Sequence, residues 1–243
     1  MNFKQFGDGE EVLLFLHGGG VSSWMWESQI NYFKNYHCIT PDLPGHGASS
    51  NEVFSMESSI NKLWNTLDEV APNKNWNVIG FSLGSQIALQ MINERPNAFK
   101  RAMINSALVI PQKTMRLCIS PTIYVTYPLI QKRAFAKLQA KTLGISDTYF
   151  EKYYMDTCNM SRSNLIHILK ENLNFVLPAT IINANTQFLF TIGEKENRLM
   201  KQSMKKLALL GKSEIIEGVG HNAPLENQQV FNRLLDNLLK NNE

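Results

Sequence analysis

Apolar residues occur in two alternating kinds of segment along the chain. Short unbroken runs, such as EVLLFL at 11–16, are typical of strands buried on both faces of a sheet. Between them lie longer segments in which apolar residues recur every three or four positions, as at 56–71, where Ile60, Leu63 and Leu67 share one helical face. Strands separated by helices require parallel crossovers, so the pattern predicts an α/β fold with a doubly wound, mostly parallel sheet.

The same alternation gives the expected order of elements. Strands are predicted at 11–16, 37–42, 75–81, 99–107, 186–193 and 213–220. Helices are predicted at 22–36, 56–71, 82–94, 197–211 and 225–241. Loops rich in glycine and other turn-forming residues follow the first two strands.

The alternation stops between residues 108 and 185. This segment is helix-like, rich in Met, Tyr, Phe and Leu, and contains no clear strand. We therefore expect one core made of 1–107 and 186–243, with 108–185 as a helical insertion. The alternative is a run of ordinary helices that cover the sheet, but so long a stretch without a strand favours an insertion.

Composition and charge narrow the class of partner. Of the 243 residues, 44% are hydrophobic and 19% are charged, which is an ordinary balance for a globular protein. The net charge of +3 and the absence of a dense basic tract indicate neither a nucleic-acid surface nor a membrane surface. No apolar run approaches the ~20 residues that a membrane helix needs.

The cysteines and the first residues bear on the compartment. Cys38, Cys118 and Cys158 are far apart and form no CxxC pair, so neither a disulfide framework nor a zinc site is indicated. Unpaired cysteines favour a reducing compartment. The first residues, MNFKQFGDGEE, contain no apolar segment of a secretory signal. We expect a cytoplasmic protein.

The strongest candidate for chemistry is Ser82, in Gly80-Phe81-Ser82-Leu83-Gly84. This G-x-S-x-G sequence lies between a predicted strand and a predicted helix. A nucleophile on such a sharp turn sits in strained backbone with its hydroxyl clear of the sheet, and the flanking glycines let strand and helix pass closely. The alternative is a serine that only caps the helix.

Four stretches, in this order, resemble the α/β-hydrolase family. They are LHGGGVSSW at 16–24, DLPGHGAS at 42–49, GFSLGS at 80–85, and GEKE at 193–196 together with GVGHNAPLE at 218–226. They span nearly the whole chain and leave only the middle segment unplaced. The resemblance implies that Ser82 is a nucleophile and that 108–185 is a helical cap over the site.

The resemblance also implies the base and the acid. His221 follows a strand in GVGHNAP, the loop that carries the base in the family, whereas the other four histidines lie in settings that favour structural roles. The family usually has aspartate in G-x-x-D, and here Glu196 occupies that position. Glu194 is the competing acid. Some relatives take the acid from the preceding strand end, but INSALV at 104–109 has no carboxylate.

The HGGG loop is expected to supply part of an oxyanion hole. By resemblance, the two donors are the N–H groups of Leu83 and Gly19, with Gly20 as the alternative to Gly19. A rival interpretation is a dinucleotide-binding domain, since HGGGVSS follows a strand and Asp42 ends the next one. Its G-x-G-x-x-G spacing fails because Ser23 stands at the third glycine position.

These residues predict a serine hydrolase that cleaves a small carboxylic ester or related acyl substrate without a cofactor or metal. A ligand receptor that keeps the fold but turns over little substrate is the alternative. An apolar pocket for the substrate is expected from aromatic and Met side chains. The candidates for its lining are Trp24, Phe81, Met115, Tyr124, Tyr127, Phe135, Tyr153, Tyr154 and Met155.

Overall fold

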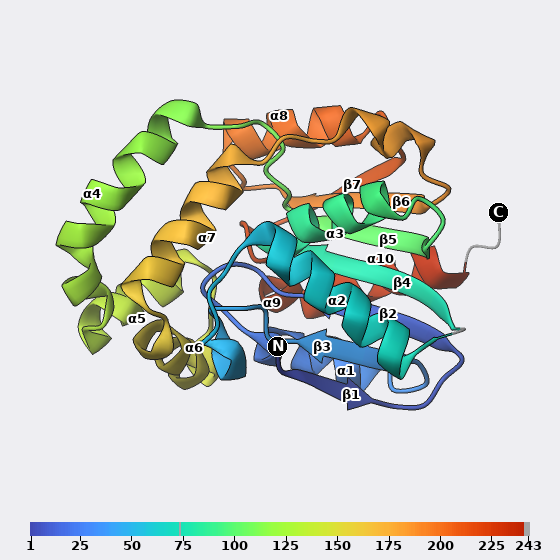
Figure 1. The fold of residues 1–243 in the computed structure, drawn as a ribbon, viewed down its shortest axis with the longest axis horizontal. Coiled ribbons are helices and arrows are strands. Elements are labelled where there is room, and N and C mark those ends of the chain that lie inside the picture. The colour runs from blue at the N-terminus through green and yellow to red at the C-terminus, as the bar shows by residue number, and fades with distance from the viewer. Residues whose placement is uncertain (73, 241–243) are drawn as a thin grey trace.

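The computed structural model describes residues 1–72 and 74–240 and contains a seven-stranded sheet with the order β1-β3-β2-β4-β5-β6-β7 (Figure 1). Strands β2 to β7 are parallel, and β1 pairs with β3 antiparallel. The strands are β1 (Phe3–Phe6), β2 (Glu11–Leu16), β3 (His37–Pro41), β4 (Asn75–Phe81), β5 (Phe99–Asn105), β6 (Gln187–Gly193) and β7 (Lys212–Ile216). The predicted doubly wound α/β fold is confirmed.

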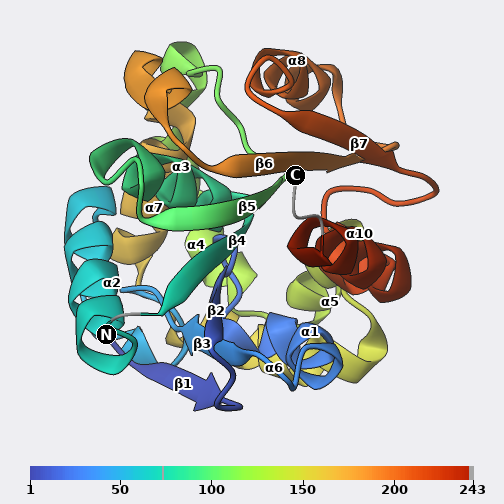
Figure 2. The same cartoon turned by 90° about the vertical axis from the view of Figure 1, so that its right-hand side faces the viewer.

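Helices cover both faces of the sheet (Figure 2). The helices of the sheet region are α1 (Glu27–Tyr32), α2 (Met56–Val70), α3 (Leu83–Glu94), α8 (Arg198–Leu207), α9 (Ala223–Glu226) and α10 (Gln228–Lys240). Alternate residues of β2 enter two separate cores: Leu14 belongs to the core that includes residues of α2, α3 and α8, and Phe15 belongs to the core that includes residues of α10. Both faces of the central strands are therefore dry, which explains their unbroken apolar runs.

Strand β1 was not predicted, and its position at the edge of the sheet explains why. It pairs only with β3, and most of its four residues are exposed. An edge strand with one neighbour tolerates polar side chains, so the apolar run that marks the other strands is missing.

Two predicted helices and one predicted strand differ from the structure. In place of a helix at 22–36 there are a 3₁₀ helix (Ser23–Trp26) and the short α1. The helix predicted at 225–241 is divided into α9 and α10, and residue 241 lies outside the described residues. Strand β7 ends at Ile216 instead of 220, because Gly218 turns the chain with a φ of +74°.

The segment between β5 and β6 consists of helices. They are α4 (Lys113–Ile130), α5 (Arg133–Thr142), α6 (Asp147–Asn159), α7 (Arg162–Asn174) and a 3₁₀ helix (Ala179–Asn183). Helices α4 to α7 lie together at one end of the sheet (Figure 1). Two buried contacts connect them to the loops of the sheet: Trp24 Nε1 donates to Asp156 Oδ2 at 2.7 Å, and Phe54 N donates to Asn164 Oδ1 at 3.0 Å.

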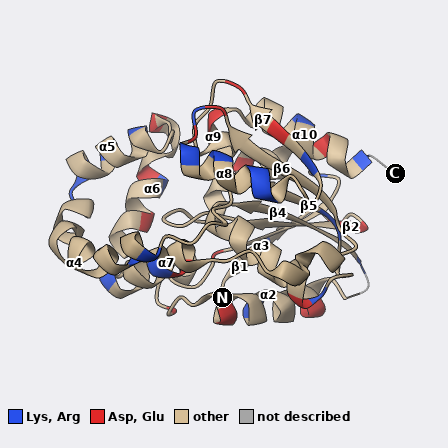
Figure 3. Ribbon diagram, turned by 90° about the horizontal axis from the view of Figure 1, so that it is seen from above, with Lys and Arg blue, Asp and Glu red and all other residues tan. Residues whose placement is uncertain are grey.

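Charged residues of both signs are distributed over the helices (Figure 3). Among residues 1–72 and 74–240, no helix is both long enough and apolar enough to cross a membrane.

Candidate active site

Ser82 lies on the sharp turn between β4 and α3. Its backbone has φ +52° and ψ −110°, a conformation that costs an L-residue about 1–3 kcal/mol. A Cβ at Gly80 would lie 2.6 Å from Ser85 Cα, and one at Gly84 would lie 2.2 Å from Leu16 O. Both flanking glycines are therefore required by the close approach of strand and helix, as the motif predicts. The Ser82 side chain does not cap α3.

The structure brings Ser82, His221 and Glu196 into one chain of hydrogen-bonding distances. His221 Nε2 lies 3.1 Å from Ser82 Oγ, and His221 Nδ1 lies 3.1 Å from Glu196 Oε2. The three residues follow β4, β7 and β6 at the carboxyl ends of parallel strands, where α/β folds build their sites. The imidazole can thus accept the serine proton on one nitrogen while the carboxylate orients the other.

Glu196 is buried, with 7% of its surface exposed, and both of its carboxylate oxygens are occupied. Oε2 faces His221, and Oε1 accepts a hydrogen bond from Ser106 Oγ at 2.5 Å. The competing acid, Glu194, is exposed and accepts instead from Gly218 N at 2.9 Å. The geometry therefore favours Glu196 over Glu194 as the acid.

Ser106 is a residue of the site that sequence reasoning missed. It directly follows β5, is 1% exposed, and has a φ of +55°. Besides its bond to Glu196, its Oγ lies 3.2 Å from His221 O. Its only sequence signal is its place after the strand in INSALV, where the analysis sought a carboxylate and found none.

The two expected oxyanion donors lie beside Ser82. Leu83 is the first residue of α3, so its N–H has no partner within the helix. A Cβ on Gly18 would lie 3.5 Å from Ser82 Cβ, which places the glycine loop next to Ser82. Within the described part of the chain, neither the Gly19 nor the Leu83 N–H donates a hydrogen bond to another group. Both donors are available to a ligand oxygen.

Buried contacts fix the loop that precedes these donors. His17 Nε2 accepts from Leu43 N at 3.0 Å, and burial lowers the pKa of His17, so the neutral ring is favoured. Asp42 accepts from Ser23 N at 2.8 Å and from Ala48 N at 2.9 Å. Although burial opposes ionisation of Asp42, the adjacent His17 ring and these N–H groups keep its pKa below the usual value. Asp42 and His17 thus serve as loop architecture.

The dinucleotide-binding alternative fails at the same loop. A phosphate-binding glycine loop leads directly into a helix whose N–H groups point at the pyrophosphate. Here residues 17–22 lead into a four-residue 3₁₀ helix, and Ser23 N is already bonded to Asp42. No group of three or more His, Cys, Asp or Glu side chains in the described chain is arranged to hold a metal ion.

Two cavities adjoin these residues. The smaller has a volume of about 90 Å³, and Gly20 forms part of its wall. The rest of its lining comes from the helical segment: Tyr127, Ile130, Gln139, Tyr153, Thr157, Met160 and Leu165. The larger has about 630 Å³, lies beside Glu196 and His221, and includes Lys141 and Lys195.

The expected apolar lining is found only in part. Tyr127 and Tyr153 line the cavity at Gly20. Phe81 lies against His221, with ring centroids 5.1 Å apart. Met115 and Met155 are exposed, with 56% of the surface of each open to solvent, and they line none of these cavities. Gln139 is a further lining residue that the sequence analysis did not select. Its Oε1 is buried and has no hydrogen-bond partner.

Comparison with known proteins agrees with this geometry. Residues 11–122 match the family described as alpha/beta hydrolase fold. The chain is 34% identical over 106 residues to (E)-2-((N-methylformamido)methylene)succinate hydrolase of Acinetobacter baylyi, covering 42% of this chain and 39% of that relative. It is 35% identical over 109 residues to pimeloyl-[acyl-carrier protein] methyl ester esterase of Wigglesworthia glossinidia brevipalpis. This match covers 43% of this chain and 39% of that relative. These matches span about two fifths of each relative's length.

A solved structure extends the likeness to the whole fold. The bromoperoxidase from Bacillus anthracis superposes with a TM-score of 0.82 and 18% sequence identity, covering 98% of this chain and 95% of that one. The sequence match covers residues 11–122, and the likeness in fold covers nearly the whole chain. The chain therefore has the α/β-hydrolase fold, and its residues 11–122 match the alpha/beta hydrolase family.

Proposed function

We propose that this protein is a serine hydrolase that cleaves a small carboxylic ester or a related acyl compound through an acyl-enzyme. The observation that carries the proposal is the hydrogen-bonded arrangement of Ser82, His221 and Glu196. A hydroxyl on a strained turn, an imidazole within reach of it and a buried carboxylate behind the imidazole are the parts that nucleophilic acyl transfer requires.

In the proposed reaction, Ser82 Oγ attacks the substrate carbonyl carbon while His221 Nε2 takes the hydroxyl proton. The tetrahedral intermediate collapses when His221 gives that proton to the leaving alcohol, which departs and leaves an acyl ester on Ser82. Water then attacks this ester, His221 accepts a proton from the water and returns it to Ser82 Oγ, and the carboxylic acid is released. The Glu196 carboxylate orients the imidazole and stabilises the imidazolium.

The oxygen that becomes negative in both steps would lie between the N–H groups of Gly19 and Leu83. Both donors are unoccupied, and Leu83 adds the positive end of the α3 dipole. Loss of one such donor typically costs about 3 kcal/mol of transition-state stabilisation.

The cavity at Gly20 suggests where the acyl or alcohol group lies. Its volume of about 90 Å³ suits a short chain, and its walls are mostly apolar or aromatic. Because residues between 127 and 165 supply all of its lining except Gly20, we propose that 108–185 acts as a cap and selects the substrate. The relatives named as a methyl ester esterase and a hydrolase support this class of reaction.

A fluorophosphonate probe with mapping of the adduct, followed by assays of p-nitrophenyl esters of graded chain length, tests the proposal. Labelling at Ser82 and turnover of short esters are expected, and Ser82→Ala should abolish both. A folded protein that is not labelled at Ser82 would refute the mechanism. Labelling without turnover of any ester would favour a ligand receptor.

A further inference from the structure

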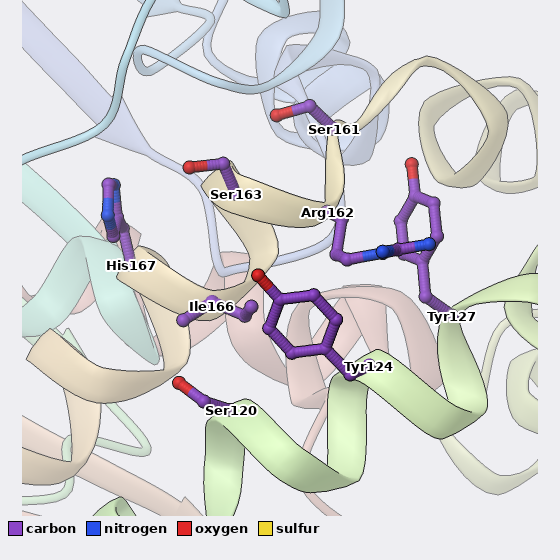
Figure 4. Close-up of a pocket in the computed structure, with 8 residues that line it drawn as sticks. All are labelled: Ser120, Tyr124, Tyr127, Ser161, Arg162, Ser163, Ile166 and His167. Carbon is purple, nitrogen blue, oxygen red and sulfur yellow. The ribbon is translucent and has the colours of Figure 1, made fainter.

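A third pocket, to which the mechanism above gives no role, lies between α4 and α7. It has a volume of about 490 Å³. It is lined by Ser120, Tyr124, Tyr127, Ser161, Arg162, Ser163, Ile166 and His167. Figure 4 shows Arg162 extending from the start of α7 toward the tyrosines of α4.

Arg162 is held in this pocket by two aromatic rings. Its guanidinium carbon lies 5.1 Å from the ring centroid of Tyr124 and 5.1 Å from that of Tyr127. These ring contacts fix the guanidinium but satisfy none of its N–H groups, and Arg162 Nε is buried with no hydrogen-bond partner among residues 1–72 and 74–240. An arginine fixed in this way has most of its side-chain entropy already removed, so it can bind an anion at lower cost.

The rest of the lining is rich in hydrogen-bond donors. Hydroxyl groups come from Ser120 and Tyr124 on α4 and from Ser161 and Ser163 at the start of α7. Among the described residues, no Asp or Glu lines the pocket, so no carboxylate there competes for the guanidinium. The 13-residue helix α7 adds the positive end of its dipole on the same side.

The pocket shares a wall with the cavity at Gly20. Tyr127 lines both, with its hydroxyl donating to Met160 O at 2.7 Å. Residues 160–166 also contribute to both. Met160 and Leu165 line the cavity at Gly20, and Ser161 and Ile166 line the pocket between α4 and α7. One tyrosine side chain therefore separates the guanidinium from the cavity beside the glycine loop.

We propose that the pocket between α4 and α7 binds a carboxylate or phosphate group through Arg162, with the Ser120, Ser163 and Tyr124 hydroxyls as further donors. Both anions offer the two or more oxygens that a guanidinium fork binds. The position of Tyr127 assigns this anion to the far end of the hydrolase substrate. That second part rests on the proposed function, whereas binding of the anion does not.

Binding is tested directly by NMR of the arginine Nε–H groups during titration with inorganic phosphate and, separately, with glutarate. The Arg162 signal, assigned by its loss in Arg162→Met, should shift and saturate, and Tyr124→Leu should weaken the binding. Arg233→Met, at an exposed site on α10, is the control and should leave the titration unchanged. A non-saturating shift, or equal shifts at all arginines, would overturn the proposal.

Enzyme kinetics distinguish an anion that is part of the ester substrate from a free anion that binds separately. Monomethyl esters of dicarboxylic acids of graded length are compared with neutral methyl esters of the same chain length. Arg162→Met should lower kcat/KM at least about tenfold for the anionic esters and leave the neutral ones unchanged. Saturable phosphate binding with no such difference would sustain the anion site and refute its assignment to the substrate. Turnover of neutral esters with no anion binding would refute the site and leave the proposed function intact.

Discussion

Ser106 Oγ donates a hydrogen bond of 2.5 Å to Glu196 Oε1, so the carboxylate behind His221 is held from two sides. Ser106 comes from the end of β5 and Glu196 from the loop after β6, and both are buried. The bond therefore sets the position of the carboxylate relative to the imidazole. A buried carboxylate oxygen without a partner would be costly, so this contact also keeps the acid in place.

Replacement of Ser106 should reduce turnover without affecting substrate binding. Ser106→Ala removes the donor to Glu196, and we expect kcat to fall about tenfold with little change in KM, measured with a short p-nitrophenyl ester. Ser106→Gly also lacks the hydroxyl but relieves the positive φ, so it should be as slow as Ser106→Ala while being more stable. Full activity in Ser106→Gly would mean that the hydroxyl does not position Glu196.

The identity of the acid is tested by a matched pair of substitutions. Glu196→Gln keeps the size of the side chain but removes the charge that stabilises the imidazolium, so kcat should fall on the order of 10³- to 10⁴-fold. Glu194→Gln should leave kcat nearly unchanged, because Glu194 is exposed and accepts from Gly218 N instead of facing His221. The opposite ranking of the two kcat values would assign the acid to Glu194.

The glycine after Ser82 should be needed for folding. In Gly84→Ala the new Cβ would lie 2.2 Å from Leu16 O, a backbone atom of the central sheet that cannot give way cheaply. We expect a loss of about 2 kcal/mol or more in the free energy of unfolding, measured with urea. In the control Gly220→Ala, the nearest atom to the new Cβ is Glu226 Oε1 at 3.3 Å, so its loss should be much smaller.

The parts of the site that could be predicted share a physical cause. Ser82, Glu196 and His221 each follow a strand of the parallel sheet, and parallel strands deliver their carboxyl ends to one edge. The position of each residue after a predicted parallel strand therefore already indicated that the three would lie close together. The glycines beside Ser82 were informative for the same reason, since they reflect a backbone approach that a Cβ prevents.

Other parts could not be predicted because nothing local marks them. Ser106 is a neutral serine whose role depends on a partner 90 residues away. Gln139 and Arg162 lie in the helices between β5 and β6, where side chains from different helices meet and no short motif predicts the packing. The edge strand β1 has too few buried positions to give an apolar run.

Gln139 should influence which esters are cleaved. Gln139 lines the cavity at Gly20, and its Oε1 is buried with no partner among the described residues, so a substrate hydroxyl within reach would satisfy it. Gln139→Leu should raise kcat/KM for a butanoate ester severalfold relative to the 3-hydroxybutanoate ester. Gln202→Leu, at an exposed position on α8, is the control and should leave the ratio of the two kcat/KM values unchanged. An unchanged ratio in Gln139→Leu would show that the amide does not contact the substrate.

The burial of Asp156 should make stability depend on pH. Burial raises the pKa of Asp156 from 3.8 to about 6, so the folded protein holds a proton there that the unfolded chain has already released. Stability from this group is therefore fully present below about pH 4 and falls as the pH rises toward 6. A rise of about two pKa units corresponds to a loss of at most about 3 kcal/mol in the free energy of unfolding.

Asp156→Asn removes the titrating group and keeps an oxygen that can accept from Trp24 Nε1. The variant should match the wild type in free energy of unfolding near pH 4 and exceed it by up to about 3 kcal/mol at pH 7, measured by urea unfolding across this range. The difference should grow mainly between pH 4 and 6, because that is where the folded and unfolded states bind different numbers of protons. A difference that is constant with pH would show that Asp156 ionises equally in both states, and that the contact between α6 and the loop after β2 carries no pH dependence.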